Sequence, residues 1–165
     1  VLIPRVVDAV SLPVVASGGI ADGRGLAAAL CLGAEGIEMG TRFVATEECR
    51  AHPSYKQAIV QASETDTMII ERSAGRPGRV LRSPYAEEIR EAEQRGIDRD
   101  QLYRLITREH NARAAIEGDM EHGYVWCGQS AALIHDVPSA GEVVRRTVVE
   151  AKSILRDRAR AMAIR

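Results

Sequence analysis

The chain has 165 residues, of which 45% are apolar and 27% charged, and its formal net charge is −1. This length allows one globular domain with a hydrophobic core, and the near-neutral charge excludes a strongly basic protein that binds nucleic acid or an anionic membrane surface. No apolar run approaches the roughly 20 residues that a membrane-spanning helix needs. Cys31, Cys49 and Cys127 are odd in number and form no CxxC pair, which indicates reduced thiols in a cytoplasmic protein rather than a disulfide framework or a zinc site.

Helical spacing of apolar residues begins at the second residue. Leu2, Ile3, Val6, Val7 and Val10 lie on one face of a predicted helix, and no strand precedes it. A complete small domain would need a self-sufficient parallel sheet of only two or three strands, and parallel sheets are normally larger. We therefore expect the C-terminal part of a longer protein. A complete small domain is the alternative.

A strand–helix–strand unit follows. Residues 13–17 are apolar and β-branched, as in a short buried strand, and residues 37–39 are predicted to be a second strand. Between them Asp22 can cap a helix that Gly33 ends. Two strands joined by such a short crossover form a right-handed parallel unit. The sequence thus predicts an α/β fold.

Both strands end in glycine. Gly18 and Gly19 follow the first strand, and Gly40 and Thr41 follow the second. Without a Cβ, the main chain can come very close to a ligand. A helix begins after the turn, and its free N–H groups and positive dipole end favour an anion. Two such ends side by side predict a site for one phosphate group, and hence a phosphorylated cofactor or substrate.

Beyond the second strand the sequence is mostly helical. The predicted helices open at Thr46, cover 53–62, 84–94 and 98–117, and end with a long helix that opens at Ser139. The pairs Asp98…Gln101 and Ser139…Glu142 can form capping boxes. Residues 67–70 could be a strand, and 73–79 is predicted to be a basic loop facing solvent. The expected buried face of the last helix is Val143, Val144, Thr147, Val148, Ala151, Ile154 and Leu155.

Linked motifs in the first third of the chain resemble a known family. They are PVVASGGIADGRG at 13–25, AAALCLGAEG at 27–36, MGTRFVATEE at 39–48 and HPSYK at 52–56. As a set they resemble the nitronate monooxygenase (2-nitropropane dioxygenase) family of flavin-dependent (β/α)8 barrels. From about 65 to 118 the similarity is thin.

The resemblance implies the C-terminal part of a TIM barrel with additional C-terminal helices. Residues 1–64 would be the last βα units of an FMN-binding barrel, and residues 65–165 would form a helical region that packs on it. The whole chain would then be part of one domain, and its partner would be the missing N-terminal half of the barrel.

The resemblance also implies an FMN site at the C-terminal mouth of the barrel. Gly18 and Gly19 would approach the FMN phosphate. The second wall would be formed by Glu38, Met39, Gly40 and Thr41. The hydroxyl of Thr41 would be a phosphate donor of suitable length.

Glu38 departs from the family pattern, because many members have Gln at this position. A carboxylate beside a phosphate dianion repels it unless the carboxylate points away or meets a cation such as Arg42. We expect Glu38 to contribute its backbone. Arg42 could instead pair with Glu47 at the surface.

By resemblance the protein is an FMN-dependent oxidoreductase that oxidises alkyl nitronates with O2. The family's catalytic base is a histidine in a Gly-Gly-His motif, which these 165 residues lack, and His52, His110, His122 and His135 do not match it. We therefore expect the chain to hold the cofactor and not to turn over a small-molecule substrate by itself. The alternatives are a flavin-dependent enoyl-acyl-carrier-protein reductase, which resembles the same stretch, and a non-catalytic phosphate-binding barrel.

Five further side chains have less specific expectations. Arg76 and Arg79 could steer an anionic ligand or simply be solvated. Gln129 could reach the mouth of the site. Tyr124 and Trp126 are expected to pack a loop rather than to stack on a flavin.

Overall fold

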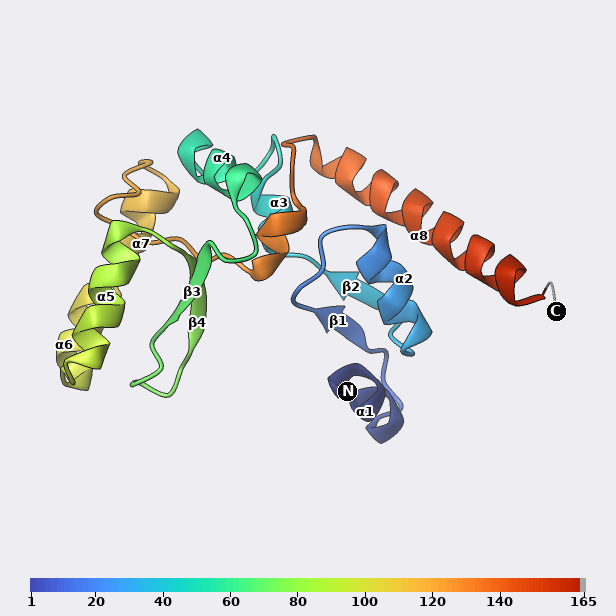
Figure 1. Ribbon diagram of the computed structural model, residues 1–165, viewed down its shortest axis with the longest axis horizontal. Coiled ribbons are helices and arrows are strands. Elements are labelled where there is room, and N and C mark those ends of the chain that lie inside the picture. The colour runs from blue at the N-terminus through green and yellow to red at the C-terminus, as the bar shows by residue number, and fades with distance from the viewer. Residues whose placement is uncertain (164–165) are drawn as a thin grey trace.

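The computed structural model describes residues 1–163 and contains two separate two-stranded sheets with helices between and around them (Figure 1). In chain order the elements are α1 Leu2–Ala9, β1 Val15–Ser17, α2 Gly23–Cys31, β2 Gly36–Glu38, α3 Thr41–Val44, α4 Pro53–Gln61, β3 Thr67–Ile70, β4 Gly78–Leu81, α5 Pro84–Gln94, α6 Arg99–Leu105, α7 Arg108–Ala115, the 3-10 helix η1 Gln129–Leu133 and α8 Ala140–Ala163. The fold is mixed α/β, and the described residues form no closed barrel.

The first sheet is the predicted strand–helix–strand unit. β1 and β2 are parallel, with Ser17 opposite Glu38 in the register, which confirms both strands and their direction. α2 connects them. The side chain of Asp22 accepts hydrogen bonds from the amides of Arg24 and Gly25, as the predicted N-cap.

α8 runs alongside α2 and packs on it (Figure 1). Its buried residues are Val143, Thr147 and Ala151, which stand four residues apart and so form one narrow stripe. Val144 and Val148 are exposed, and their predicted burial is wrong. A straight helix against a single neighbouring helix buries only this stripe, and the residues one position further along lie beside it.

The second sheet is an antiparallel hairpin of β3 and β4, with Ile69 opposite Arg79. The strand predicted over 67–70 is confirmed. β4 begins at Gly78, so the last part of the predicted loop 73–79 is strand. The sequence did not indicate this strand because β4 also pairs with a residue far along the chain, through a bridge between Val80 and Trp126. The hairpin and its covering helices bury Met68, Ile70, Val80, Tyr85, Ala86, Ile89, Leu102 and Tyr124.

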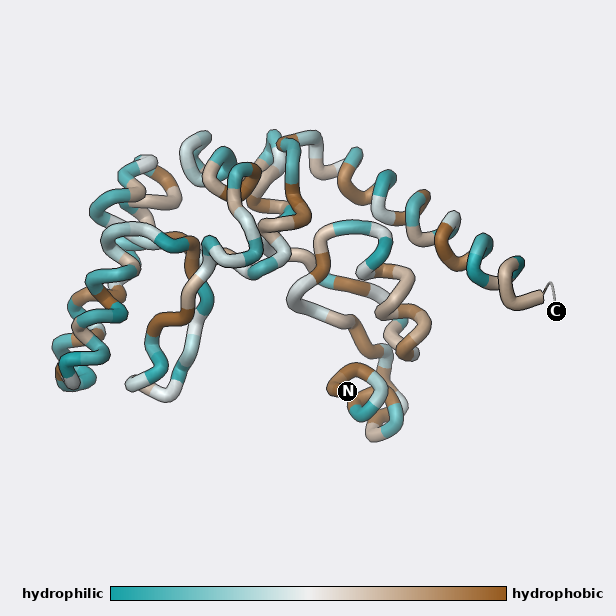
Figure 2. The backbone as a smooth tube through the Cα atoms, in the orientation of Figure 1, coloured by the Kyte–Doolittle hydropathy of each residue, from teal (hydrophilic) through white to brown (hydrophobic). Residues whose placement is uncertain are grey.

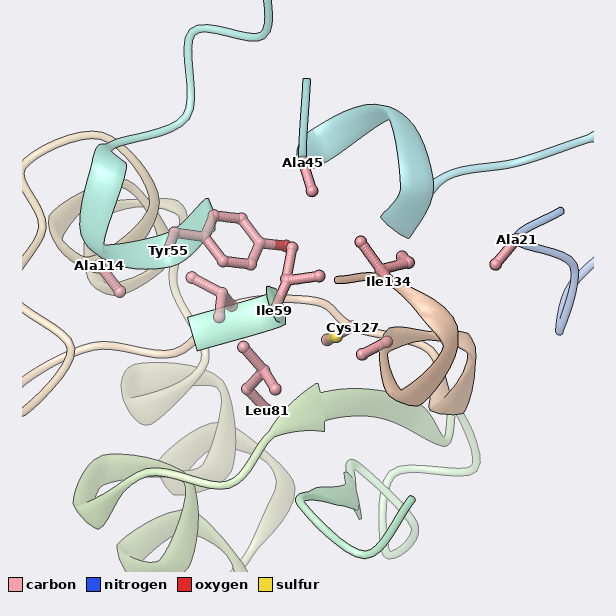
Figure 3. Packing of buried hydrophobic residues seen from close by; sticks show 10 residues of the cluster. Ala21, Ala45, Tyr55, Ile59, Leu81, Ala114, Cys127 and Ile134 are labelled. Atoms are coloured by element: carbon pink, nitrogen blue, oxygen red, sulfur yellow. The ribbon is translucent and has the colours of Figure 1, made fainter. Parts of the chain in front are cut away.

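A second cluster of buried residues lies where α3, α4 and η1 meet (Figure 3). It consists of Ala21, Ala45, Tyr55, Ile59, Leu81, Ala114, Val125, Cys127, Ala131 and Ile134. The Tyr55 hydroxyl donates a hydrogen bond to the carbonyl of Trp126. This bond ties α4 to the segment 126–128.

Two predicted helices have the wrong extent. No helix opens at Thr46 in the described chain. The main chain here bonds to a distant segment instead, since the amide of Glu47 donates to the carbonyl of Pro138 at 3.0 Å, and the carboxylate of Glu48 accepts the amide of Ala140 at 2.8 Å. The helix predicted over 98–117 is two helices, α6 and α7. The side chain of Thr107 accepts the amide three residues later and starts α7.

The two predicted capping boxes differ. The Asp98…Gln101 box is complete at the start of α6. At α8, Oγ of Ser139 accepts the amide of Glu142 at 3.2 Å, but the carboxylate of Glu142 accepts from Arg145 at 2.6 Å. At α8, therefore, only the hydrogen bond to the Ser139 hydroxyl of the predicted capping box forms.

Several apolar side chains of the N-terminal part lie at the surface, where Figure 2 shows hydrophobic stretches in α1 and β1. Leu2 is 75% exposed, Leu12 73% and Val15 57%. Parallel strands are normally covered on both faces. This side of the first sheet is therefore open to a further layer of protein.

Candidate functional site

The two glycine-ended strands meet at one edge of the first sheet. Because β1 and β2 are parallel and Ser17 stands opposite Glu38, the residues after both strands leave the sheet at the same edge. Gly18 and Gly19 have φ values of +96° and +74°, which residues with a side chain rarely adopt. Gly40 directly precedes α3 on the other strand. The structure thus brings the glycines of both predicted walls together.

The space above this edge is open. A Cβ added to Gly18, Gly19 or Gly40 would meet no heavy atom within 4 Å. Among residues 1–163, no backbone hydrogen bond uses the amide of Gly19, Gly40 or Thr41. The edge therefore has open space next to main-chain N–H groups that have no backbone partner, and such N–H groups are the donors that anion sites use.

The other residues of the second wall contribute differently. Met39 is 8% exposed, so its side chain belongs to the protein interior. Oγ1 of Thr41 accepts a hydrogen bond from the amide of Gly128 at 3.0 Å. Because a hydroxyl both donates and accepts, Thr41 also has a hydrogen to donate, and Sγ of Cys127 is one acceptor within its reach.

The N-terminus of α2 does not supply the free N–H groups that the sequence predicted. Gly23 donates to Oε2 of Glu150 at 2.8 Å, and Arg24 and Gly25 donate to the carboxylate of Asp22 at 2.9 and 3.3 Å. Burial opposes ionisation of Asp22, but hydrogen bonds from Arg24 and Gly25 outweigh it and lower the pKa. Two carboxylates already satisfy this helix end, so phosphate binding would rest on the strand-end residues.

Arg42 is buried and pairs with Asp136, so the surface pair predicted with Glu47 is wrong. Its Nη1 donates to Oδ1 of Asp136 at 3.1 Å, and its Nη2 donates to the carbonyls of Asp136 and Ala45 at 2.7 and 2.5 Å. Burial lowers the pKa of Arg42, and Asp136 partly offsets that effect. Arg42 is therefore held away from Glu38, whose exposed carboxylate ends β2.

A pocket of about 390 Å³ adjoins the second wall. It is lined by Gly40, Thr41, Val44, Tyr55, Arg79, Asn111, Ala115, Trp126, Cys127 and Gly128. Burial raises the pKa of Cys127 to about 12, so this thiol is no nucleophile near neutral pH. The pocket combines aromatic and aliphatic walls with one guanidinium, which suits binding rather than nucleophilic chemistry.

The less specific expectations have mixed outcomes. Tyr124 is buried and meets Trp126 edge to face at 5.3 Å, which confirms that this pair packs the loop. Trp126 is nevertheless 41% exposed and lines the pocket beside Thr41. Gln129 donates to the carbonyl of Glu64 at 3.4 Å.

None of the histidines lines this pocket in the described chain. His52 caps α4 through a hydrogen bond that Nδ1 accepts from the amide of Ser54. His122 contacts Asp119 at the surface at 3.0 Å. Among residues 1–163 no three His, Cys, Asp or Glu side chains gather around a possible metal position, and no helix has the length and apolarity to cross a membrane.

The model of the nitronate monooxygenase family matches residues 1–150. The chain belongs to the nitronate monooxygenase family. Probable nitronate monooxygenases of Staphylococcus saprophyticus and Staphylococcus haemolyticus are 37% and 36% identical over 157 and 154 residues. These alignments cover 93% of this chain and 43% of each relative. The chain thus spans less than half the length of the curated relatives it matches.

Two solved structures resemble the chain over most of its length. FabK from Thermotoga maritima is 42% identical with a TM-score of 0.90, covering 98% of this chain and 51% of that one. Nitroalkane oxidase from Streptomyces ansochromogenes is 30% identical with a TM-score of 0.75, covering 93% and 44%. The predicted family and the α/β class are therefore confirmed.

Proposed function

We propose that this chain is the FMN-phosphate-binding part of an FMN-dependent oxidoreductase that oxidises alkyl nitronates with O2. The observation that carries the proposal is the shared strand edge, where Gly18, Gly19 and Gly40 leave room that a Cβ would occupy. The amides of Gly19, Gly40 and Thr41 would bind the phosphate dianion. Bound FMN would accept electrons from the substrate and pass them to O2.

The fold and family support the same arrangement for the whole protein. Residues 1–64 would supply the last βα units of a TIM barrel, and residues 65–165 would pack on it. The exposed apolar side chains of α1 and β1, such as Leu2 and Val15, would be covered by the remaining strands of the barrel. The catalytic base would come from the part of the barrel that these 165 residues do not include, and the enzyme would work in the cytoplasm.

A flavin-dependent enoyl-acyl-carrier-protein reductase is the second candidate. FabK, an enoyl-acyl-carrier-protein reductase that matches this chain with a TM-score of 0.90 and 42% identity, favours this candidate. The same phosphate site would serve both reactions. The reactions differ in their substrates. A nitronate is a small anion, whereas an enoyl thioester is neutral at its reacting end and needs NAD(P)H as a reductant.

Purification of the natural protein that carries this chain separates these candidates. We expect a yellow protein that releases FMN on denaturation and consumes O2 with propane-2-nitronate. NAD(P)H consumption with an enoyl thioester, and none of O2 with the nitronate, would favour the reductase. A colourless protein that does not take up FMN would contradict both candidates and leave a non-catalytic phosphate-binding barrel.

Replacing Glu38 by glutamine is expected to tighten FMN binding about two- to fivefold at low salt, because it removes a negative charge at the edge of the phosphate site. The gain should shrink at high salt, since ions screen exposed charges. Titration of the flavin-free protein with FMN at two ionic strengths measures both effects. Equal affinities of Glu38→Gln and the natural protein at low salt would show that the carboxylate points away from the phosphate.

A further inference from the structure

The pocket beside Thr41 contains one charged side chain, Arg79. Arg79 stands on β4 opposite Ile69 and is half-buried. Its Nη1 donates to Oγ1 of Thr67 at 3.0 Å. No ion pair within residues 1–163 includes Arg79. The hairpin therefore holds a cation at the pocket without an acidic partner.

Hydrogen bonds connect Arg79 to the second wall of the phosphate site. The amide of Cys127 donates to the carbonyl of Arg79 at 3.0 Å. The next amide, that of Gly128, donates to Oγ1 of Thr41 at 3.0 Å. The adjacent residues Cys127 and Gly128 thus connect the main chain of Arg79 to the side chain of Thr41 through one hydrogen bond each. Both border one pocket, so a ligand there could lie close to a group bound at the glycines.

The chemistry of the lining indicates what Arg79 would bind. Partly buried charges in proteins are normally paired, and a guanidinium carries five N–H donors, of which Thr67 takes one. The remaining donors form a planar fork that suits an anion with two oxygens. Tyr55 and Trp126 add aromatic walls, which suit a short alkyl group. A nitronate has both parts, since its charge is shared by two oxygens on an alkyl carbon.

We infer that Arg79 binds the two oxygens of the nitronate substrate in the pocket beside Thr41, with the alkyl group against Trp126. This inference rests on the proposed function, because it assigns a substrate to the same site. Arg79 would then select anionic nitronates over neutral nitroalkanes of equal size. From the sequence alone, Arg79 could either steer an anionic ligand or simply be solvated.

The test compares Arg79→Gln and Arg79→Lys with the matched control Arg82→Gln, in the natural protein that carries this chain. Arg82 belongs to the same hairpin segment but pairs with Glu87 and lines a different pocket. Propanoate serves as a redox-inert anion of similar shape, and its binding is followed by the fluorescence of Trp126, with Trp126→Phe to identify the signal. We expect propanoate affinity to fall about 10- to 100-fold in Arg79→Gln and less in Arg79→Lys, which keeps the charge but loses the fork.

Turnover gives a second readout. In Arg79→Gln the KM for propane-2-nitronate should rise by a similar factor of about 10 to 100, while the KM for neutral 2-nitropropane stays unchanged. Arg82→Gln should match the natural protein. Thermal unfolding of each variant checks the fold, and Arg79→Lys carries the test if Arg79→Gln does not fold.

The outcomes separate this inference from the proposed function. Nitronate oxidation with an unchanged KM in both Arg79 variants would overturn the inference and leave the proposed function in place. Propanoate binding that depends on Arg79 in a protein without nitronate oxidation would contradict the function but keep the anion site. Weaker binding of FMN, with propanoate binding intact, would assign Arg79 to the cofactor phosphate and overturn the inference.

Discussion

Replacing Gly40 by alanine is expected to weaken FMN binding about 10- to 100-fold, because the added methyl group would occupy the room of the phosphate and break a charge-assisted hydrogen bond. The fold should persist. Gly40 has φ −84° and ψ −70°, which alanine adopts readily, and its Cβ would meet no heavy atom within 4 Å. Fluorescence titration of the flavin-free protein with FMN gives the two dissociation constants.

Gly141→Ala is the matched control. Gly141 also has no heavy atom within 4 Å of an added Cβ. It stands in the first turn of α8, however, and not at the glycine edge, the edge of the first sheet where Gly18, Gly19 and Gly40 lie. We expect this variant to bind FMN like the natural protein and to be slightly more stable, because alanine favours a helix over glycine. If Gly40→Ala bound FMN as tightly as Gly141→Ala, Gly40 would lie outside the phosphate site.

Replacing Arg42 by methionine is expected to lower the free energy of unfolding by about 3 kcal/mol, because it leaves the buried carbonyl of Ala45 and the carbonyl of Asp136 without their donor. Arg42 is the buried partner of this ion pair, with a side chain 7% exposed against 46% for Asp136. Its Nε is buried without a hydrogen-bond partner, which reduces the net benefit of the pair. Urea unfolding followed by circular dichroism measures the loss.

Arg145→Met provides the comparison for this second variant. Arg145 makes a similar pair with Glu142, but its side chain is 63% exposed, and exposed pairs stabilise proteins little. We expect no measurable change in its unfolding midpoint. Equal stability of the Arg42 and Arg145 variants would show that the buried pair contributes nothing to holding the segment between η1 and α8 against α3.

Much of the first sheet could be predicted because its signals are local. The β-branched run at 13–17, the cap at Asp22 and the glycines after each strand lie within a few residues of the structures they determine. The shared edge then followed from the rule that a short strand–helix–strand unit is parallel. For the same reason the capping box at Asp98 could be read directly.

The contacts that shape the rest of the site join residues far apart in the chain. Glu150 takes the amide of Gly23 across 127 positions, and Asp136 holds Arg42 across 94. No local pattern marks such partners, so the sequence suggested only Glu38 or Glu47 as partners of Arg42, and it predicted free amides at the start of α2. The break before α7 was missed for another reason: Thr107 is a preferred N-cap residue type, but the helical pattern continues on both sides of it.

The affinities of the natural protein for FMN and riboflavin provide the most direct test, because these two flavins differ only in the phosphate group. If the amides of Gly19, Gly40 and Thr41 bind that phosphate, FMN should bind at least about 100-fold more tightly than riboflavin, or ~2.7 kcal/mol. The Gly40→Ala variant should lose most of this preference. Equal affinities of the natural protein for the two flavins would contradict phosphate binding at the glycine edge.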